Sequence, residues 1–219
     1  MRKSLYSASR SRGFSLVEAL IVIAIILIIT ATAVVSIQPT LKQAHSDAGA
    51  AIVADYMRRA RDLAVGERRN YQLQFTQPGG QVPGYMQLLR GTYSSLTQST
   101  TYTPYPNGNP TDGIVPLPND MQFLLPTTKP VLPPDGFGAQ ANNIDFYDVT
   151  NPGNNVTLLT FRPDGTVVAN TGGTINGAVY MARPNDDNSP RAVTLFGATG
   201  RIKKWRVVKT AGAPVWKLL

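Results

Sequence analysis

The chain opens with a long apolar run that only one charge interrupts. Within residues 14–37, Glu18 is the only charged side chain. At about 1.5 Å per helical residue these 24 positions extend for roughly 36 Å. A bilayer hydrocarbon core is about 30 Å thick. The pattern therefore predicts a transmembrane helix over residues 14–38.

A helical period follows the apolar run and extends to about residue 65. Apolar positions recur every three or four residues at Leu41, Ala44, Ala48, Ile52, Tyr56, Ala60 and Leu63. This spacing predicts an amphipathic continuation of the helix over residues 39–66. We expect Pro39 to kink the helix or to restart it, and Gly66 to end it.

From residue 70 onward the pattern alternates, which is typical of strands with one buried face. Tyr71, Leu73 and Phe75 predict the first strand, and residues 84–90 predict its hairpin partner after a Pro-Gly-Gly turn. Further strands are expected at residues 143–149, 156–162, 166–169, 178–183, 192–196 and 201–208. Residues 91–141 are rich in proline and threonine. Because proline lacks an N–H for the sheet ladder, we expect a long loop there, with short strands at 114–115 and 121–125.

Together these elements predict an α+β fold, in which a long N-terminal helix packs on a C-terminal antiparallel β-sheet. The helix is transmembrane first and amphipathic afterwards. Residues 67–219 would form one β-rich exported domain, a length that supports a hydrophobic core.

Glu18 is unusual because a carboxylate at the centre of a bilayer costs about 2.5–3.5 kcal/mol and normally has a functional partner. If the chain were cut after Gly13, Phe14 would carry a positive amine one helical turn from Glu18. The Phe14 amine of a neighbouring subunit would be an equivalent partner for Glu18. The alternative is a plain signal anchor whose Glu18 reaches to the membrane surface.

Residues 13–20 read Gly-Phe-Ser-Leu-Val-Glu-Ala-Leu, and Ile-Val-Ile-Ala-Ile-Ile follows. This segment resembles the prepilin leader and N-terminal helix of type IV pilins and type II secretion pseudopilins. The resemblance implies that prepilin peptidase removes residues 1–13 by cutting after Gly13 and methylates the new N-terminal Phe14. It also implies that Glu18 helps the subunit assemble with other pilins in a filament.

The basic leader gives an expected orientation. Arg2, Lys3, Arg10 and Arg12 would hold the N-terminus on the cytoplasmic side of the bacterial inner membrane, with the C-terminal domain exported to the periplasm. Loss of these four residues lowers the formal net charge from +8 to +4.

Short segments farther along the chain are similar to H-type minor pseudopilins and FimT-like minor pilins. They lie at residues 57–64, 161–167, 191–193 and 197–202. The resemblance implies one of two functions, a subunit of a secretion pseudopilus or type IV pilus, or a DNA-binding minor pilin of natural transformation. A membrane-anchored domain unrelated to filaments is a third alternative.

A run of basic residues near the C-terminus is the candidate DNA site. It contains Arg201, Lys203, Lys204 and Arg206. The segment Gly200-Arg201-Ile202-Lys203 is similar to the Gly-Arg-x-Arg motif with which FimT-like pilins bind DNA. Strand alternation places Arg201 and Lys203 on one face and the other two on the opposite face. Trp205 would add base stacking; alternatively, the lysines protect a sheet edge and Trp205 lies in the core.

The sequence contains no pattern of an enzyme or metal site. Cysteine is absent and His45 is the only histidine, so neither a zinc site nor a disulfide is expected. No Gly-x-Ser-x-Gly elbow or Walker lysine occurs. We therefore expect a non-enzymatic protein without cofactors.

Overall fold

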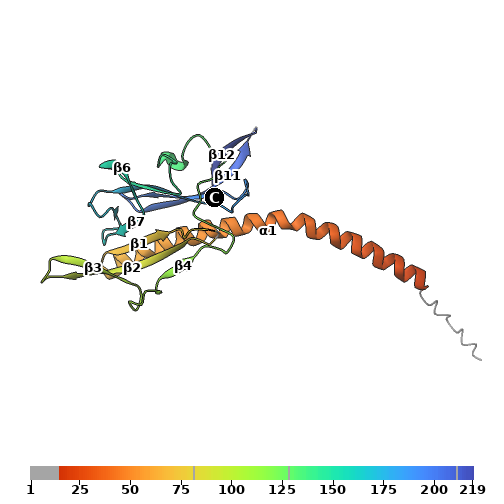
Figure 1. Cartoon of the computed structure of the whole chain (residues 1–219), viewed down its shortest axis with the longest axis horizontal. Helices are drawn as coiled ribbons and strands as arrows, with labels where there is room; N and C mark the ends of the chain where they lie inside the picture. The colour runs from red at the N-terminus through yellow and green to blue at the C-terminus, as the bar shows by residue number, and fades with distance from the viewer. Residues whose placement is uncertain (1–14, 81, 128, 211) are drawn as a thin grey trace, which may run out of the picture. The chain divides into compact units, whose positions relative to one another are not determined.

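The computed structural model describes residues 15–219 except residues 81, 128 and 211. It divides into two compact units, Met1–Leu41 and Lys42–Leu219. The first unit contributes the apolar start of helix α1, and the second contains the rest of α1 and all the strands (Figure 1).

Helix α1 (Leu16–Glu67) is 52 residues long and includes Pro39. The helix therefore does not restart at Pro39, and that alternative is wrong. The helix also continues through Gly66, the residue that was expected to end it, to Glu67. The residue that ends it is Arg68, whose φ of 52° is left-handed, and the amide of Arg69 donates to the carbonyl of Ala64 at 3.2 Å. This 6→1 hydrogen bond is the usual closure of a helix C-terminus, although glycine normally occupies the left-handed position.

The buried stripe of α1 differs from the predicted one. Leu41, Ala44 and Ala48 are exposed, and Ile52 and Leu63 are half-buried. Tyr56 and Ala60 of the predicted stripe are buried. The buried face that contains Ala60 has spacings of four and three, and its other members were not predicted: Ser46, Ala50, Val53, Met57 and Ala64. Alanine predominates on this face, which lets the helix approach the strands closely.

Among the described residues, twelve strands and one 3₁₀ turn follow the helix. They are β1 (Tyr71–Thr76), β2 (Tyr85–Ser94), β3 (Ser99–Pro104), β4 (Ile114–Pro116), η1 (Pro134–Gly136), β5 (Ile144–Asp148), β6 (Asn151–Val156), β7 (Leu158–Phe161), β8 (Val167–Val168), β9 (Ile175–Met181), β10 (Arg191–Phe196), β11 (Arg201–Thr210) and β12 (Ala213–Leu218).

The strands form two antiparallel sheets of six strands each. The first sheet has the order β3-β2-β1-β7-β8, and β4 pairs with β2. The second has the order β12-β11-β10-β9-β5-β6. The α+β class and the antiparallel pairing are confirmed, and the strands of the β-rich domain divide between two sheets. The chain enters the second sheet at β5, returns to the first for β7 and β8, and ends in the second.

The predicted loop at residues 91–141 is partly a hairpin. β2 extends to Ser94 and pairs with β3 along six residue pairs. This hairpin is possible because the first proline of the segment, Pro104, comes only at its end. The short strand at 114–115 is confirmed as β4. Residues 121–125 form only an isolated bridge, between Gln122 and Ala182.

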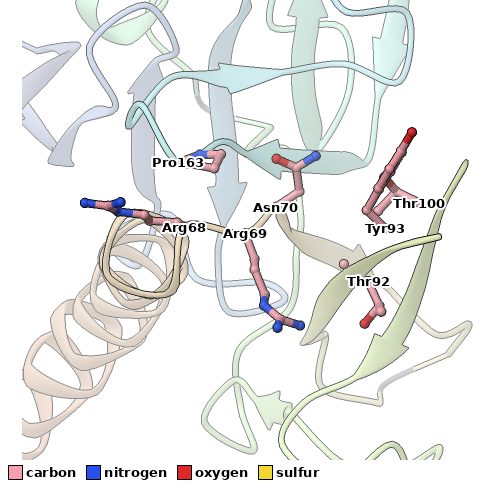
Figure 2. Close-up of a pocket in the computed structure, with 8 residues that line it drawn as sticks. Arg68, Arg69, Asn70, Thr92, Tyr93, Thr100 and Pro163 are labelled. Atoms are coloured by element: carbon pink, nitrogen blue, oxygen red, sulfur yellow. The ribbon is translucent and has the colours of Figure 1, made fainter. Parts of the chain in front are cut away.

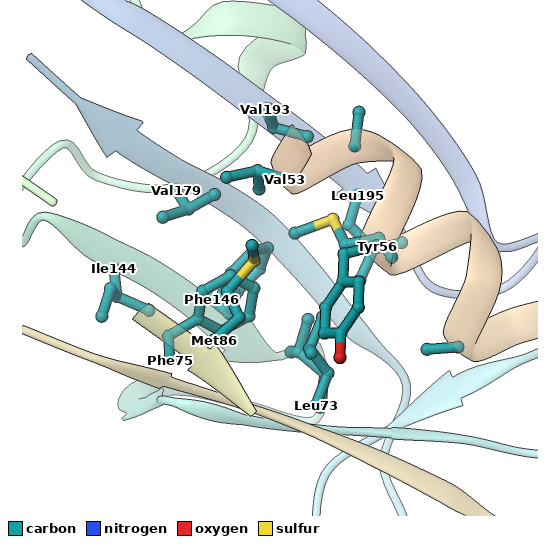
Figure 3. Packing of buried hydrophobic residues seen from close by; sticks show 14 of the residues in the cluster. Val53, Tyr56, Leu73, Phe75, Met86, Ile144, Phe146, Val179, Val193 and Leu195 are labelled. Carbon is teal, nitrogen blue, oxygen red and sulfur yellow. The ribbon is translucent and has the colours of Figure 1, made fainter. Parts of the chain in front are cut away.

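One hydrophobic core joins the helix to both sheets. Figure 3 shows Val53 and Tyr56 of α1 beside side chains of the first sheet, such as Leu73, and of the second sheet, such as Val193. The sheets also touch directly, since the ring centroids of Phe75 and Phe146 are 5.7 Å apart. Each fully buried side chain of this size stabilises the fold by about 1.5–3 kcal/mol.

Candidate functional site

The apolar part of α1 is uncovered in the first unit. Large apolar side chains are exposed along it, for example Leu16 at 80 % and Ile28 at 66 %. By length and composition, the helix is able to cross a membrane. An apolar surface of this extent requires a lipid or protein environment.

The hydroxyl groups in this segment are satisfied within the helix itself. Thr30 donates to the carbonyl of Ile26 at 2.7 Å, and Ser36 donates to the carbonyl of Ala33 at 2.9 Å. Such internal hydrogen bonds suit an apolar solvent, in which water does not replace them.

Glu18 is different from these hydroxyl groups. It lies in the first turn of α1, and within the described part of the chain no cation pairs with it. A carboxylate at the first turn is favoured by the helix dipole. The predicted cleavage residue Gly13 and the predicted mature N-terminus Phe14 lie outside the described residues.

The four basic candidates lie on β11 but do not share one surface. Arg201 and Lys203 lie on the face of the second sheet that turns toward η1. There Nζ of Lys203 is 2.7 Å from Oδ1 of Asp135, and a guanidinium nitrogen of Arg201 is 4.0 Å from Oδ2 of the same carboxylate. Asp135 therefore neutralises part of the positive charge on this face.

The other two basic residues alternate to the helix side of β11. Ile202 packs on the main core, and Lys204 and Arg206 follow it at two-residue spacing. Arg206 lies directly opposite Arg191 of β10, and its Nε is buried without a hydrogen-bond partner. A flat DNA strand cannot contact both faces of β11 at once.

Trp205 is half-buried on its own domain. It packs with a small cluster on the outer face of the second sheet that contains Ala178, Tyr180 and Ala192. Its indole Nε1 donates to Oγ1 of Thr194 at 3.0 Å. The sheet therefore holds the Trp205 ring in place, and less of the ring surface is free to stack on a nucleic-acid base.

Asp135 is the residue that sequence reasoning missed at this strand. It precedes Lys203 by 68 positions and lies in the proline-rich stretch, where no local pattern connects it to β11. Only the path of the chain over the outer face of the second sheet brings the two side chains together.

The comparison with protein families bears on the N-terminal segment. The model of the prokaryotic N-terminal methylation motif matches residues 8–34. No curated protein and no solved structure matches the chain. The matched residues contain Glu18 and the start of the apolar run.

The motif implies processing by prepilin peptidase and assembly with other pilins. With the exposed apolar helix, it also indicates membrane anchoring. The chain therefore carries the N-terminal motif of type IV pilins and pseudopilins at residues 8–34.

Proposed function

We propose that this chain is a minor, non-enzymatic subunit of a type II secretion pseudopilus or of a type IV pilus. The observation that carries the proposal is the composition of α1. One continuous helix contains an exposed apolar stretch with a single carboxylate and then the buried stripe of the β-rich unit. A helix of this kind would provide both a segment able to enter a membrane and a packing surface for the exported domain.

The proposed assembly step depends on charge pairing in an apolar environment. Cleavage after Gly13 exposes the amine of Phe14, and Glu18 of an adjacent subunit accepts this positive charge. Pairing relieves the penalty of about 2.5–3.5 kcal/mol that an unpaired carboxylate pays at the bilayer centre. The leader is cytoplasmic in this proposal, and Lys42–Leu219 is exported.

The assignment as a minor subunit rests on the short segments that resemble H-type pseudopilins and FimT-like pilins. Two of them meet in the structure, because Nε of Arg61 contacts the carbonyl of Gly165 at 3.4 Å. Arg61 also fills the space beside Gly200, where an added Cβ would lie 2.6 Å from its Nε. The resembling segments thus form one contact between the helix and two turns.

The test separates processing from assembly. The full chain is produced with a prepilin peptidase and its partner pilins, and the mass of the mature N-terminus is measured beside the amount recovered in the filament fraction. We expect Glu18→Gln to be cleaved and methylated normally but largely lost from filaments. Thr30→Val is the matched control, because its hydroxyl bonds only its own helix, and it should assemble normally.

Two results would contradict the proposal. Retention of residues 1–13 in the presence of the peptidase would favour a plain signal anchor. Filament recovery of Glu18→Gln at the wild-type level would remove the role of the carboxylate in assembly.

The second candidate function is DNA binding by β11. It is supported by Arg201, whose side chain is 55 % exposed, and opposed by the contact of Lys203 with Asp135. DNA affinity should be titrated against salt for the mature chain and for a variant with Arg201, Lys203, Lys204 and Arg206 changed to Ala. Loss of binding and of its salt dependence in the variant would support this function. Equal binding by both proteins would exclude these residues.

A further inference from the structure

A concave pocket lies where the chain leaves α1 and enters the first sheet. Its volume is about 370 Å³, and its walls include Arg68, Arg69, Asn70, Thr92, Tyr93 and Thr100 (Figure 2). These side chains offer two cations, an amide, two hydroxyls and an aromatic ring. No acidic residue is among the described residues that line it.

The base of the pocket depends on glycine. The amide of Gly91 donates to the carbonyl of Asn70 at 2.8 Å, which holds the helix-exit loop against β2. A Cβ at this position would lie 2.8 Å from that carbonyl oxygen and 3.0 Å from Cγ2 of Thr100. On the opposite wall, Tyr93 of β2 pairs directly with Thr100 of β3. The pocket is therefore fixed by backbone pairing on both sides.

The two arginines are not required by the fold. Arg68 has the left-handed φ that glycine adopts most readily, so an arginine there is a poor choice for closing the helix. Within the described part of the chain, neither Arg68 nor Arg69 forms an ion pair. The preceding acid, Glu67, instead accepts a hydrogen bond from the hydroxyl of Tyr71 at 2.6 Å. Two unneutralised guanidinium groups thus lie at the helix end. Figure 2 shows the Arg68 side chain extending away from Tyr93 and Thr100, and the Arg69 side chain extending in a different direction, on the side of Thr92.

The side chains of the pocket define the ligand chemistry. Guanidinium groups bind carboxylate or phosphate oxygens in a bidentate manner. Amide and hydroxyl groups bind the hydroxyls of a polar ligand. The Tyr93 ring, in a residue that is 65 % exposed, provides a flat surface for the face of a ligand ring. We propose that this pocket binds an acidic sugar unit, a uronate or a sugar phosphate, of a polysaccharide.

The shape and position of the pocket favour a sugar over a nucleic acid. Single-stranded nucleic acids bind along extended basic grooves with several stacking rings, whereas one aromatic ring lines this compact pocket among the described residues.

Within Lys42–Leu219, the pocket lies at the C-terminal end of α1, about 38 Å along the helix from Lys42. It is therefore remote from the end of this unit that continues into the apolar segment. The proposal does not depend on the type of filament.

The experiment uses the mature full-length chain in a detergent without a sugar headgroup. Binding is measured for an oligogalacturonate of six units, its neutral methyl ester, a single-stranded thymidine oligonucleotide and inorganic phosphate. The variants are Arg69→Gln and Tyr93→Ala, with Arg59→Gln as the control that makes the same change at an exposed position farther up α1. Because Arg69 is itself exposed, Arg69→Gln should fold as stably as the wild type.

We expect the acidic oligosaccharide to bind and its methyl ester to bind at least about tenfold more weakly, since the ester removes a charged hydrogen-bond acceptor. Arg69→Gln and Tyr93→Ala should each weaken binding by about tenfold, and Arg59→Gln should not. Equal binding of the ester would overturn recognition of charge. Stronger binding of the oligonucleotide, lost in the same variants, would make this a nucleic-acid pocket. Binding of phosphate alone, or of no probe, would also overturn the proposal.

Discussion

Nε of Arg191 lies 2.5 Å from Oδ1 of Asp47, and this pair ties strand β10 to helix α1. The arginine side chain is 2 % exposed, while the aspartate side chain is 39 % exposed. The arginine also donates to the carbonyl of Pro190 at 3.0 Å. A buried guanidinium is thus satisfied by one carboxylate that retains contact with water.

Replacing Asp47 by Ala should lower the free energy of unfolding by about 2 kcal/mol. The change leaves the buried charge of Arg191 without its ion-pair partner, and the partial exposure of Asp47 keeps the loss below that of a fully buried pair. Denaturant unfolding of the mature chain in detergent measures the effect. Asp62→Ala removes an exposed acid from the same helix and should change stability by less than about 0.5 kcal/mol. Equal effects of the two variants would show that the ion pair is unimportant.

Met57→Ala should lower the free energy of unfolding by about 2–5 kcal/mol. Met57 lies on the face of α1 that packs on the strands and is fully buried, so shortening its side chain leaves a cavity. Thermal unfolding of the second unit measures the loss. Val65 of the same helix is 46 % exposed, so Val65→Ala serves as the control and should have little effect. A small effect of Met57→Ala would mean that the helix packs on the sheets through another face.

Asp148 should make stability depend on acidity. Oγ1 of Thr171 donates to Oδ2 of Asp148 at 2.5 Å, and the hydroxyl and amide of Thr150 donate to Oδ1. These hydrogen bonds lower the pKa of the Asp148 carboxyl, the bond from Thr171 most of all. In acid, the unfolded chain therefore binds this proton before the folded chain does. The stabilisation is complete above the unfolded pKa of about 4 and is lost as the pH falls through the lower folded pKa.

Thr171→Val removes the strongest of these bonds and tests the acid effect. We expect the variant to be less stable than the wild type at pH 6 and to lose less additional stability between pH 6 and pH 3. Unfolding curves at a series of pH values measure both quantities. Parallel losses in the two proteins would indicate that other carboxyl groups control the acid response.

If β11 binds DNA, as the second candidate function proposes, Asp135→Asn should increase this affinity at low salt. The change removes the carboxylate that neutralises Lys203 and lies 4.0 Å from Arg201, so both cations become available to phosphates. The slope of log affinity against log salt should steepen by about one to two units. The double variant with Lys203→Ala should reverse part of the gain. An unchanged slope would show that this face of β11 does not meet DNA.

Local patterns predicted much of the fold. Alternation in Tyr71, Leu73 and Phe75 identified β1, because strand burial has a period of two that neighbouring residues display directly. The same alternation predicts that Gln72 lies on the exposed, polar face of β1, but in the structure Gln72 is buried. Nε2 of Gln72 donates to Oγ1 of Thr160 on β7, a partner 88 positions away. Such a satisfied polar group cannot be recognised from its own sequence neighbourhood.

Features that depend on contacts between distant parts of the chain were not predicted from the sequence. Several faces of α1 carry alanine or other apolar residues, so periodicity alone did not identify the face that the two sheets cover. β12 is not among the strands expected from the sequence, yet it pairs with β11 along six residue pairs. At the candidate site, the spacing of basic residues predicted their alternation on β11, but the nearby Asp135 had no sequence signal.

The passage of α1 through Pro39 has a mechanical consequence. Proline has no N–H to donate to the carbonyl four positions earlier, so the backbone ladder of this helix lacks a bond at that turn. In the filament proposed above, tension between the apolar segment and the sheets would travel along this backbone. The helix would then lengthen first around Pro39, and this lengthening would protect the packed residues beyond Lys42 from the load.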